Sequence, residues 1–160
     1  MDEKSSIDLN NNPREIVGTR VIDAPREIVW QAWTDPKHLA QWWGPIGFTT
    51  TTSSFDMRPG GVWRFVMHGP DGRDYQNRVT FIDIVKPERI VYRHGGGDDV
   101  EPVLFETTVV FEDFGGKTRL VWTGKFPTAD QRTAVIKNYG ADKGLLQTMA
   151  RLAEFAETKS

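Results

Sequence analysis

The three histidines, His38, His68 and His94, are the side chains in this sequence best suited to proton transfer or metal binding. They lie far apart, and none belongs to a His-x-x-x-His pair that would place two ligands on one helical face. The chain has no cysteine, which excludes disulfides, thiolate zinc sites, iron–sulfur clusters and cysteine nucleophiles. None of its serines lies in a Gly-x-Ser-x-Gly elbow. We therefore predict no catalytic residue, no metal site and no cofactor, and we favour a protein that is not an enzyme.

A glycine-rich, acidic segment follows His94. The glycines at 95–97 are not followed by the Lys-Ser/Thr pair and helix start that a phosphate-binding loop requires. Asp98, Asp99 and Glu101 do not alternate with other residues as calcium ligands do in a binding loop. The pattern indicates a solvated loop.

Four of the six tryptophans occur close together in the first third of the chain. Trp30, Trp33, Trp42 and Trp43 lie in two short segments whose apolar residues recur at helical spacing. A single tryptophan is more often a core residue than a ligand contact. Near the opening of a hollow protein, however, flat amphipathic rings also suit a hydrophobic ligand. The sequence leaves both interpretations open.

Alternation along the predicted strands identifies one apolar face of a sheet. Trp63 and Phe65 share one parity, whereas Arg64 and His68 share the other and are expected to face solvent. The same rule, extended to the neighbouring strands and the C-terminal helix, gives the predicted ligand-binding residues: Trp63, Phe65, Asn77, Phe81, Tyr92, His94, Phe105, Thr107, Trp122, Leu145 and Met149.

Four members of this inward set are polar, namely Asn77, Tyr92, His94 and Thr107. A buried polar group needs a hydrogen-bond partner. The partner is either a ligand or water in a hollow interior, or another strand through mutual cross-strand bonds. Both alternatives remain open from the sequence.

An α+β fold must position these side chains. Alternation from residue 14 onward predicts a first strand that ends at residues 23–25, and two short helices follow before Gly44 and Pro45. Glycine and proline pairs recur between β-branched and aromatic runs over residues 48–125, which predicts only strands and turns there. The expected sheet is curved and antiparallel, with seven strands in all.

The C-terminal region predicts a long amphipathic helix. Thr128 and Gln131 form a capping-box pair at its start, and we expect a break near Gly140. The first residues of the chain are mostly polar, so we predict a flexible tail over 1–12 and a single domain over 13–158.

The composition sets further limits on function. The 160 residues are enough for one domain with a real core, and the formal net charge of −2 gives no general attraction to nucleic acid or anionic lipid. No apolar run is long enough to span a membrane, and no signal-peptide pattern opens the chain. We expect a cytoplasmic protein that binds no nucleic acid.

Five motifs occur in an order that resembles a known family: RVIDAP (20–25), AWTDP (32–36), WWGP (42–45), RPGG (58–61) and RLAE (151–154). They are similar to the START-like SRPBCC superfamily, in the branch of the C-terminal domain of the activator of the heat-shock protein 90 ATPase. The resemblance covers residues 14–158. It implies a helix-grip fold, in which a curved antiparallel sheet surrounds the last helix and an apolar cavity, and a link to the stress response.

The resemblance also implies the classes of partner. Members of the superfamily bind lipids, hydrophobic metabolites or chaperones, so we expect binding of a small hydrophobic or amphipathic molecule in the cavity. One alternative is a chaperone-interacting module similar to the heat-shock protein 90 ATPase activator. Because only about a dozen polar residues precede the fold, we expect little effect on that ATPase. The other alternative is a hydrolase or cyclase that uses the same cavity, with His94 or an acidic neighbour as general base.

Overall fold

The computed structural model describes residues 5–96 and 103–159, which form one antiparallel sheet and four helices. The strands are β1 (Ser5–Asp8), β2 (Glu15–Ile22), β3 (Thr49–Phe55), β4 (Val62–His68), β5 (Asp74–Val85), β6 (Arg89–Gly96), β7 (Val103–Phe114) and β8 (Lys117–Lys125). The helices are α1 (Arg26–Thr34), α2 (Pro36–Trp42), α3 (Ala129–Tyr139) and α4 (Ala141–Glu157). The acidic positions Asp98, Asp99 and Glu101 lie outside the described residues.

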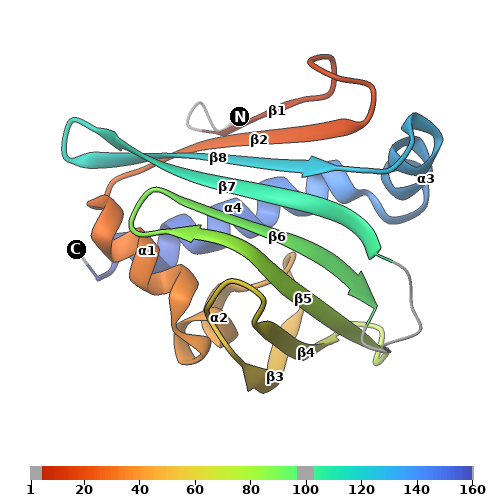
Figure 1. Ribbon diagram of the computed structural model, residues 1–160, viewed down its shortest axis with the longest axis horizontal. Coiled ribbons are helices and arrows are strands. Elements are labelled where there is room, and N and C mark those ends of the chain that lie inside the picture. Colours follow the sequence, from red (N-terminus) through yellow and green to blue (C-terminus); the bar gives the residue numbers. More distant parts are fainter. Residues whose placement is uncertain (1–4, 97–102, 160) are drawn as a thin grey trace.

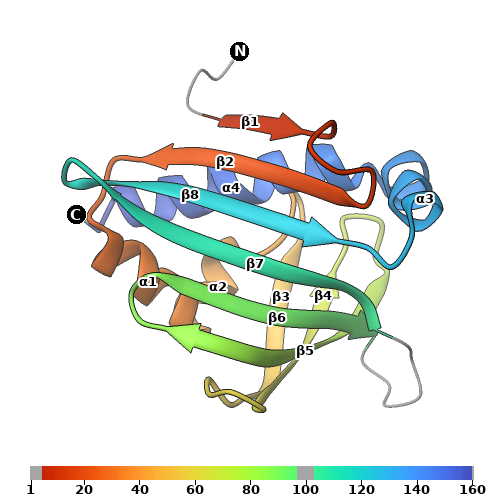
Figure 2. The same ribbon diagram turned by 45° about the horizontal axis from the view of Figure 1, so that its top comes forward.

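The strands follow the order β1-β2-β8-β7-β6-β5-β4-β3. Helices α1, α2 and α4 all lie on one face of this sheet, and no helix of the described residues lies on the opposite face (Figure 1). The sheet is curved, and α4 runs along its concave face (Figure 2). Register shifts at Thr52/Ser54, Phe81/Asp83 and His94/Gly95 contribute to the curvature, because a bulge bends its strand. The predicted helix-grip fold is confirmed.

The sheet has eight strands in the described part of the chain, one more than the seven expected. The additional strand is β1, which pairs with β2 from Ser5 opposite Arg20 to Asp8 opposite Val17. The prediction of a flexible tail over 1–12 therefore does not hold for residues 5–8. The sequence pattern did not predict β1 because four residues are too few to show a clear alternation. Its pairing depends on the free edge of β2, a feature that the sequence of residues 1–12 does not contain.

Helix α4 provides the main contact between helix and sheet. Met149, Leu152 and Ala156 are fully buried, and Leu145 packs at the edge of the same core. This spacing of three to four residues presents one apolar stripe to the sheet, as predicted. The predicted break is also confirmed, because Gly140 adopts φ 62° between α3 and α4.

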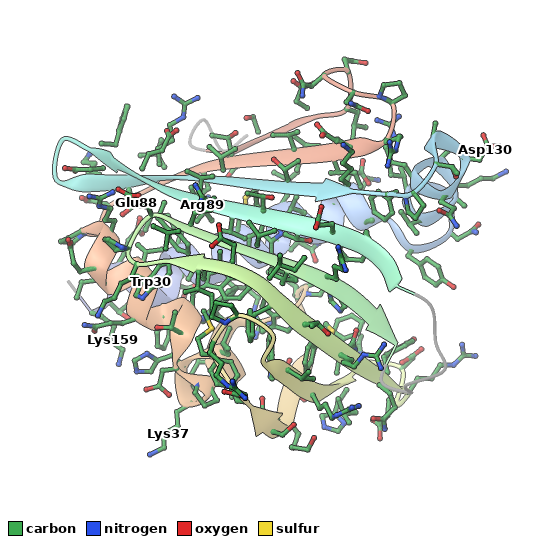
Figure 3. The ribbon with its side chains drawn as sticks, viewed as in Figure 1. Trp30, Lys37, Glu88, Arg89, Asp130 and Lys159 are labelled. Atoms are coloured by element: carbon green, nitrogen blue, oxygen red, sulfur yellow. The ribbon has the colours of Figure 1, made fainter. Side chains whose placement is uncertain are left out.

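Helices α1 and α2 fill one end of the concave face. The rings of Trp30, Trp33 and Trp42 are buried there. Trp30 meets Phe111 edge-on at a centroid distance of 5.2 Å. Figure 3 shows Trp30 on α1 at the same end of the sheet as Arg89. Trp43 is buried as well, so all four clustered tryptophans are core residues.

Candidate functional site

A cavity of about 300 Å³ lies at one end of the concave face, the end that α1 and α2 do not fill. It lies between the sheet and the helical pair α3 and α4. Its walls are apolar for the most part and come from every layer of the fold: Ile16, Trp43, Gly44, Pro45, Met67, Tyr92, His94, Phe105, Thr107, Trp122, Gly124, Phe126, Val135, Tyr139, Ala141, Leu145 and Thr148.

The turn at Gly140 determines the position of the helical wall. A residue in the left-handed conformation ends α3 and lets α4 start in a new direction. As a result, Val135 and Tyr139 of α3 and Leu145 of α4 line the same space.

The loop after α2 forms another wall and is held by Arg151 of α4. The Nη1 atom of Arg151 donates hydrogen bonds to the carbonyl oxygens of Trp43, Gly44, Pro45 and Phe48 at 2.9–3.4 Å. Desolvation by burial lowers the pKa of this guanidinium. Because Trp43, Gly44 and Pro45 line the cavity, Arg151 fixes the cavity wall from the outside.

Three polar side chains from adjacent strands gather at the sheet side of the cavity. Tyr92 and Thr107 are buried and face each other across β6 and β7, with Trp122 of β8 beside them. Burial raises the pKa of the Tyr92 phenol above its usual value, although nearby Thr107 and Trp122 act in the opposite direction. The hydroxyl of Thr107 has no partner of standard hydrogen-bond geometry, so its contact with Tyr92 is weak. A buried hydroxyl in this state is expected to find its partner in whatever fills the cavity.

His94 lies next to this group on β6. The centroid of its ring lies 5.0 Å from the ring centroid of Phe105 and 5.9 Å from the ring centroid of Phe65. Burial lowers the pKa of the imidazole to about 4, and the surface that remains accessible lines the cavity. At pH 7 the ring is neutral.

A cross-strand hydrogen bond joins His94 to Asn77. The His94 Nε2 atom lies 2.8 Å from the Asn77 Oδ1 atom. The amide nitrogen of Asn77 in turn donates to the carbonyl oxygen of Tyr75 at 2.9 Å. Both interpretations of the inward polar residues are thus represented. Asn77 and His94 bond to each other across the strands, while the Thr107 hydroxyl has no partner of standard hydrogen-bond geometry.

The cavity walls carry no Lys, Arg, Asp or Glu among the residues that the structure describes. Nor do the described residues contain a group of three or more His, Asp or Glu side chains placed to hold a metal ion. In the same part of the chain, no helix is long and apolar enough to cross a membrane. The arrangement can hold an uncharged apolar molecule and offer it a few hydrogen bonds.

Six of the eleven predicted site residues line the cavity: Tyr92, His94, Phe105, Thr107, Trp122 and Leu145. Four others are packed into the core beyond the cavity, namely Trp63, Phe65, Phe81 and Met149. The rings of Trp63 and Phe65 stack at 3.9 Å, which leaves no room between them. Asn77 reaches the cavity only through its bond to His94. Parity identified the correct face of the sheet but did not separate packed positions from open ones.

The sequence interpretation missed most of the helical and loop wall. Val135 and Tyr139 could have been found, because residues four apart on a helix share one face. Ile16 is the second residue of β2, and Phe126 directly follows the last residue of β8. No local signal marks these two residues as cavity-lining.

A larger groove of about 700 Å³ adjoins the cavity and shares Pro45, Met67 and Tyr139 with it. Tyr139 is 81% exposed and Ile46 69% exposed, so the outer rim of this groove is apolar.

The fold and the cavity define a helix-grip protein. The chain belongs to the family of Activator of Hsp90 ATPase homolog 1-like proteins, whose model matches residues 23–157. No curated protein matches the chain.

Solved structures of bacterial proteins share the fold. A protein from Arthrobacter aurescens is 23% identical, with a TM-score of 0.87 over 96% of this chain and 91% of that one. Protein NE0264 from Nitrosomonas europaea is 22% identical, with a TM-score of 0.83 over 93% and 97% of the two chains. Protein CV1439 from Chromobacterium violaceum is 25% identical, with a TM-score of 0.76 over 91% and 99%. These similarities concern the architecture.

Proposed function

We propose that this protein binds a small hydrophobic or amphipathic molecule in the cavity between the sheet and helix α4. The observation that carries the proposal is an apolar cavity of about 300 Å³ with polar groups gathered on one wall, among them the Thr107 hydroxyl, which has no partner of standard hydrogen-bond geometry. A concave apolar site with a few convergent polar groups is the usual form of a small-molecule site, and this volume lies at the lower end of the common range.

The walls and the polar groups have separate roles in this proposal. Apolar contacts supply the affinity, at about 25 cal/mol for each Å² removed from water. Tyr92, His94 and Thr107 fix the orientation of the molecule, because each can form a hydrogen bond that water no longer supplies inside the cavity.

Gly124 offers a direct test, since its strand position lines the cavity. A Cβ atom built there would lie 3.9 Å from Phe105 and 4.0 Å from Phe126, which is ordinary contact. Gly124→Val should therefore fold and occupy part of the cavity. Thr123→Val, on the opposite face of the same strand, is the matched control.

The experiment has two parts. Native mass spectrometry of freshly purified protein should show a co-purifying small molecule. Titration with fatty acids, flavonoids and polyketide-like aromatics should change tryptophan fluorescence with saturation for at least one class, because Trp43 and Trp122 line the cavity. Gly124→Val should weaken that binding at least about tenfold, which corresponds to about 1.4 kcal/mol, and Thr123→Val should not. Equal binding by both variants would place the ligand elsewhere and refute the proposal.

Family membership favours a second candidate, a module that contacts the Hsp90 chaperone. Such a module would use an outer surface, so the Gly124→Val variant would retain its activity. Addition of the protein to purified chaperone tests this candidate. Several-fold stimulation of the ATPase at stoichiometric protein, unaffected by Gly124→Val, would favour it over ligand binding.

A further inference from the structure

His94 presents a defined hydrogen-bonding pattern to the cavity. The Asn77 amide has one fixed orientation, because its Nδ2 atom donates to the carbonyl oxygen of Tyr75 at 2.9 Å. The reverse orientation would set the Asn77 oxygen against that carbonyl, and two acceptors repel. The Asn77 oxygen therefore faces His94.

This orientation decides which nitrogen of His94 carries the proton. An amide oxygen can only accept, so the Nε2 atom of His94 must donate across the 2.8 Å contact. In a neutral imidazole the other nitrogen is then an acceptor. Burial lowers the pKa of His94 to about 4, so the ring stays neutral at pH 7. Among the residues that the structure describes, none donates a hydrogen bond to the Nδ1 atom.

The surroundings of His94 exclude a charged partner. The described cavity walls hold no Lys or Arg, and the rings of Phe65 and Phe105 flank the imidazole. A carboxylate placed here would lose its hydration without a compensating cation, which is costly. It would also bring a second acceptor against the Nδ1 lone pair. A neutral hydroxyl, in contrast, would supply the missing donor.

We propose that His94, held in one tautomer by Asn77, selects ligands that bring a hydroxyl donor to its Nδ1 atom, so that the cavity takes neutral phenols or alcohols in preference to ethers, hydrocarbons and carboxylates. This proposal rests on the proposed function and names its ligand class. Asn77 acts as a positioning residue, because it sets the tautomer from the groove side while His94 contacts the ligand.

The tautomer can be measured without any ligand. Long-range ¹H–¹⁵N correlation spectra of the free protein at pH 7 should show His94 neutral and protonated at Nε2. A neutral ring protonated at Nδ1, or a charged ring, would refute the proposal. In Asn77→Leu the fraction of the Nε2–H form should fall relative to the wild type, because the acceptor that favours it is gone.

Selectivity is measured with four two-ring probes of similar size: naphthalene, 2-methoxynaphthalene, 2-naphthol and 2-naphthoate. Only 2-naphthol carries a neutral hydroxyl donor. Calorimetry should show it binding at least about fivefold more tightly than the other three, as a net hydrogen bond of about 1 kcal/mol predicts. His94→Phe keeps an aromatic ring in the same slot and should abolish this preference while naphthalene binding persists. Met67→Leu, another change in the cavity wall, should preserve the preference.

The outcomes separate this proposal from the one it rests on. Equal affinity for naphthalene and 2-naphthol in the wild type, or an unchanged preference in His94→Phe, would refute the role of His94 and leave the cavity as a binding site. If none of the probes binds and no small molecule co-purifies, the proposed function fails, and the selectivity fails with it.

Discussion

Replacing His94 with Gln should make the protein less sensitive to acid. Burial lowers the pKa of His94 from 6.5 to about 4, so the unfolded chain takes up a proton at a pH where the folded protein does not. Stability decreases with falling pH wherever the unfolded state binds more protons. The stabilisation that the neutral ring contributes to the folded state is therefore fully present above pH 6.5. It decreases between pH 6.5 and 4 and is absent at lower pH.

The size of the effect follows from the same two values. The difference between 6.5 and about 4 corresponds to about 3 kcal/mol, since one pH unit is worth about 1.4 kcal/mol. A domain is stable by only about 5–15 kcal/mol in total, so a loss of this size is measurable. Gln keeps a polar group beside Asn77 but cannot titrate.

Urea denaturation between pH 7.5 and 4.5 is the assay. Carboxylates also make the stability of the wild type and of each variant depend on pH. Because they are the same in both proteins, the difference between the wild type and His94→Gln removes their contribution. From pH 7.5 to 4.5 the wild type should lose about 2–3 kcal/mol more than His94→Gln does. The cavity variant Met67→Leu, which removes no titratable group, should follow the wild type. Parallel curves for the wild type and His94→Gln would show that His94 is not desolvated in the folded protein.

Three further substitutions test the framework around the cavity. Leu152 is fully buried under the sheet, so Leu152→Ala should cost about 2–5 kcal/mol in urea denaturation, and a loss below about 1 kcal/mol would remove it from the core. Gly72 adopts φ 83° in the β4–β5 turn, so Gly72→Val should cost about 1–3 kcal/mol. The Gly72→Val variant should bind ligand as tightly as the wild type does. If its thermal stability were unaltered, the left-handed conformation assigned to Gly72 in this turn would be wrong. Arg151→Met removes the donor that holds residues 43–48 and should cost about 2 kcal/mol. Faster hydrogen exchange confined to that loop and to α4 is expected, and an unchanged exchange rate would show that Arg151 does not hold the loop.

The local sequence determined the elements and their faces. The capping residue Thr128 accepts a hydrogen bond from the backbone N–H of Gln131 at 3.1 Å, and the helix break lies at Gly140, both as predicted. Alternation along β4 placed Trp63 and Phe65 inward, where both are buried. These features depend on backbone preferences and on the period of the side chains, and neighbouring residues alone fix them.

Only the tertiary structure decided which inward residues surround a cavity. Trp63 and Tyr92 both face the concave side, yet Trp63 is stacked in the core while Tyr92 lines the open space. The difference arises along the strands rather than across the sheet, because α1 and α2 lie at one end of the concave face and α3 lies at the other (Figure 2). The cavity is at the end near α3. Parity specifies a face and contains no information on how far a covering helix extends. The tautomer of His94 is likewise set by Asn77, 17 positions away in the sequence, because an imidazole takes its hydrogen-bonding pattern from the groups that the fold brings to its two nitrogens.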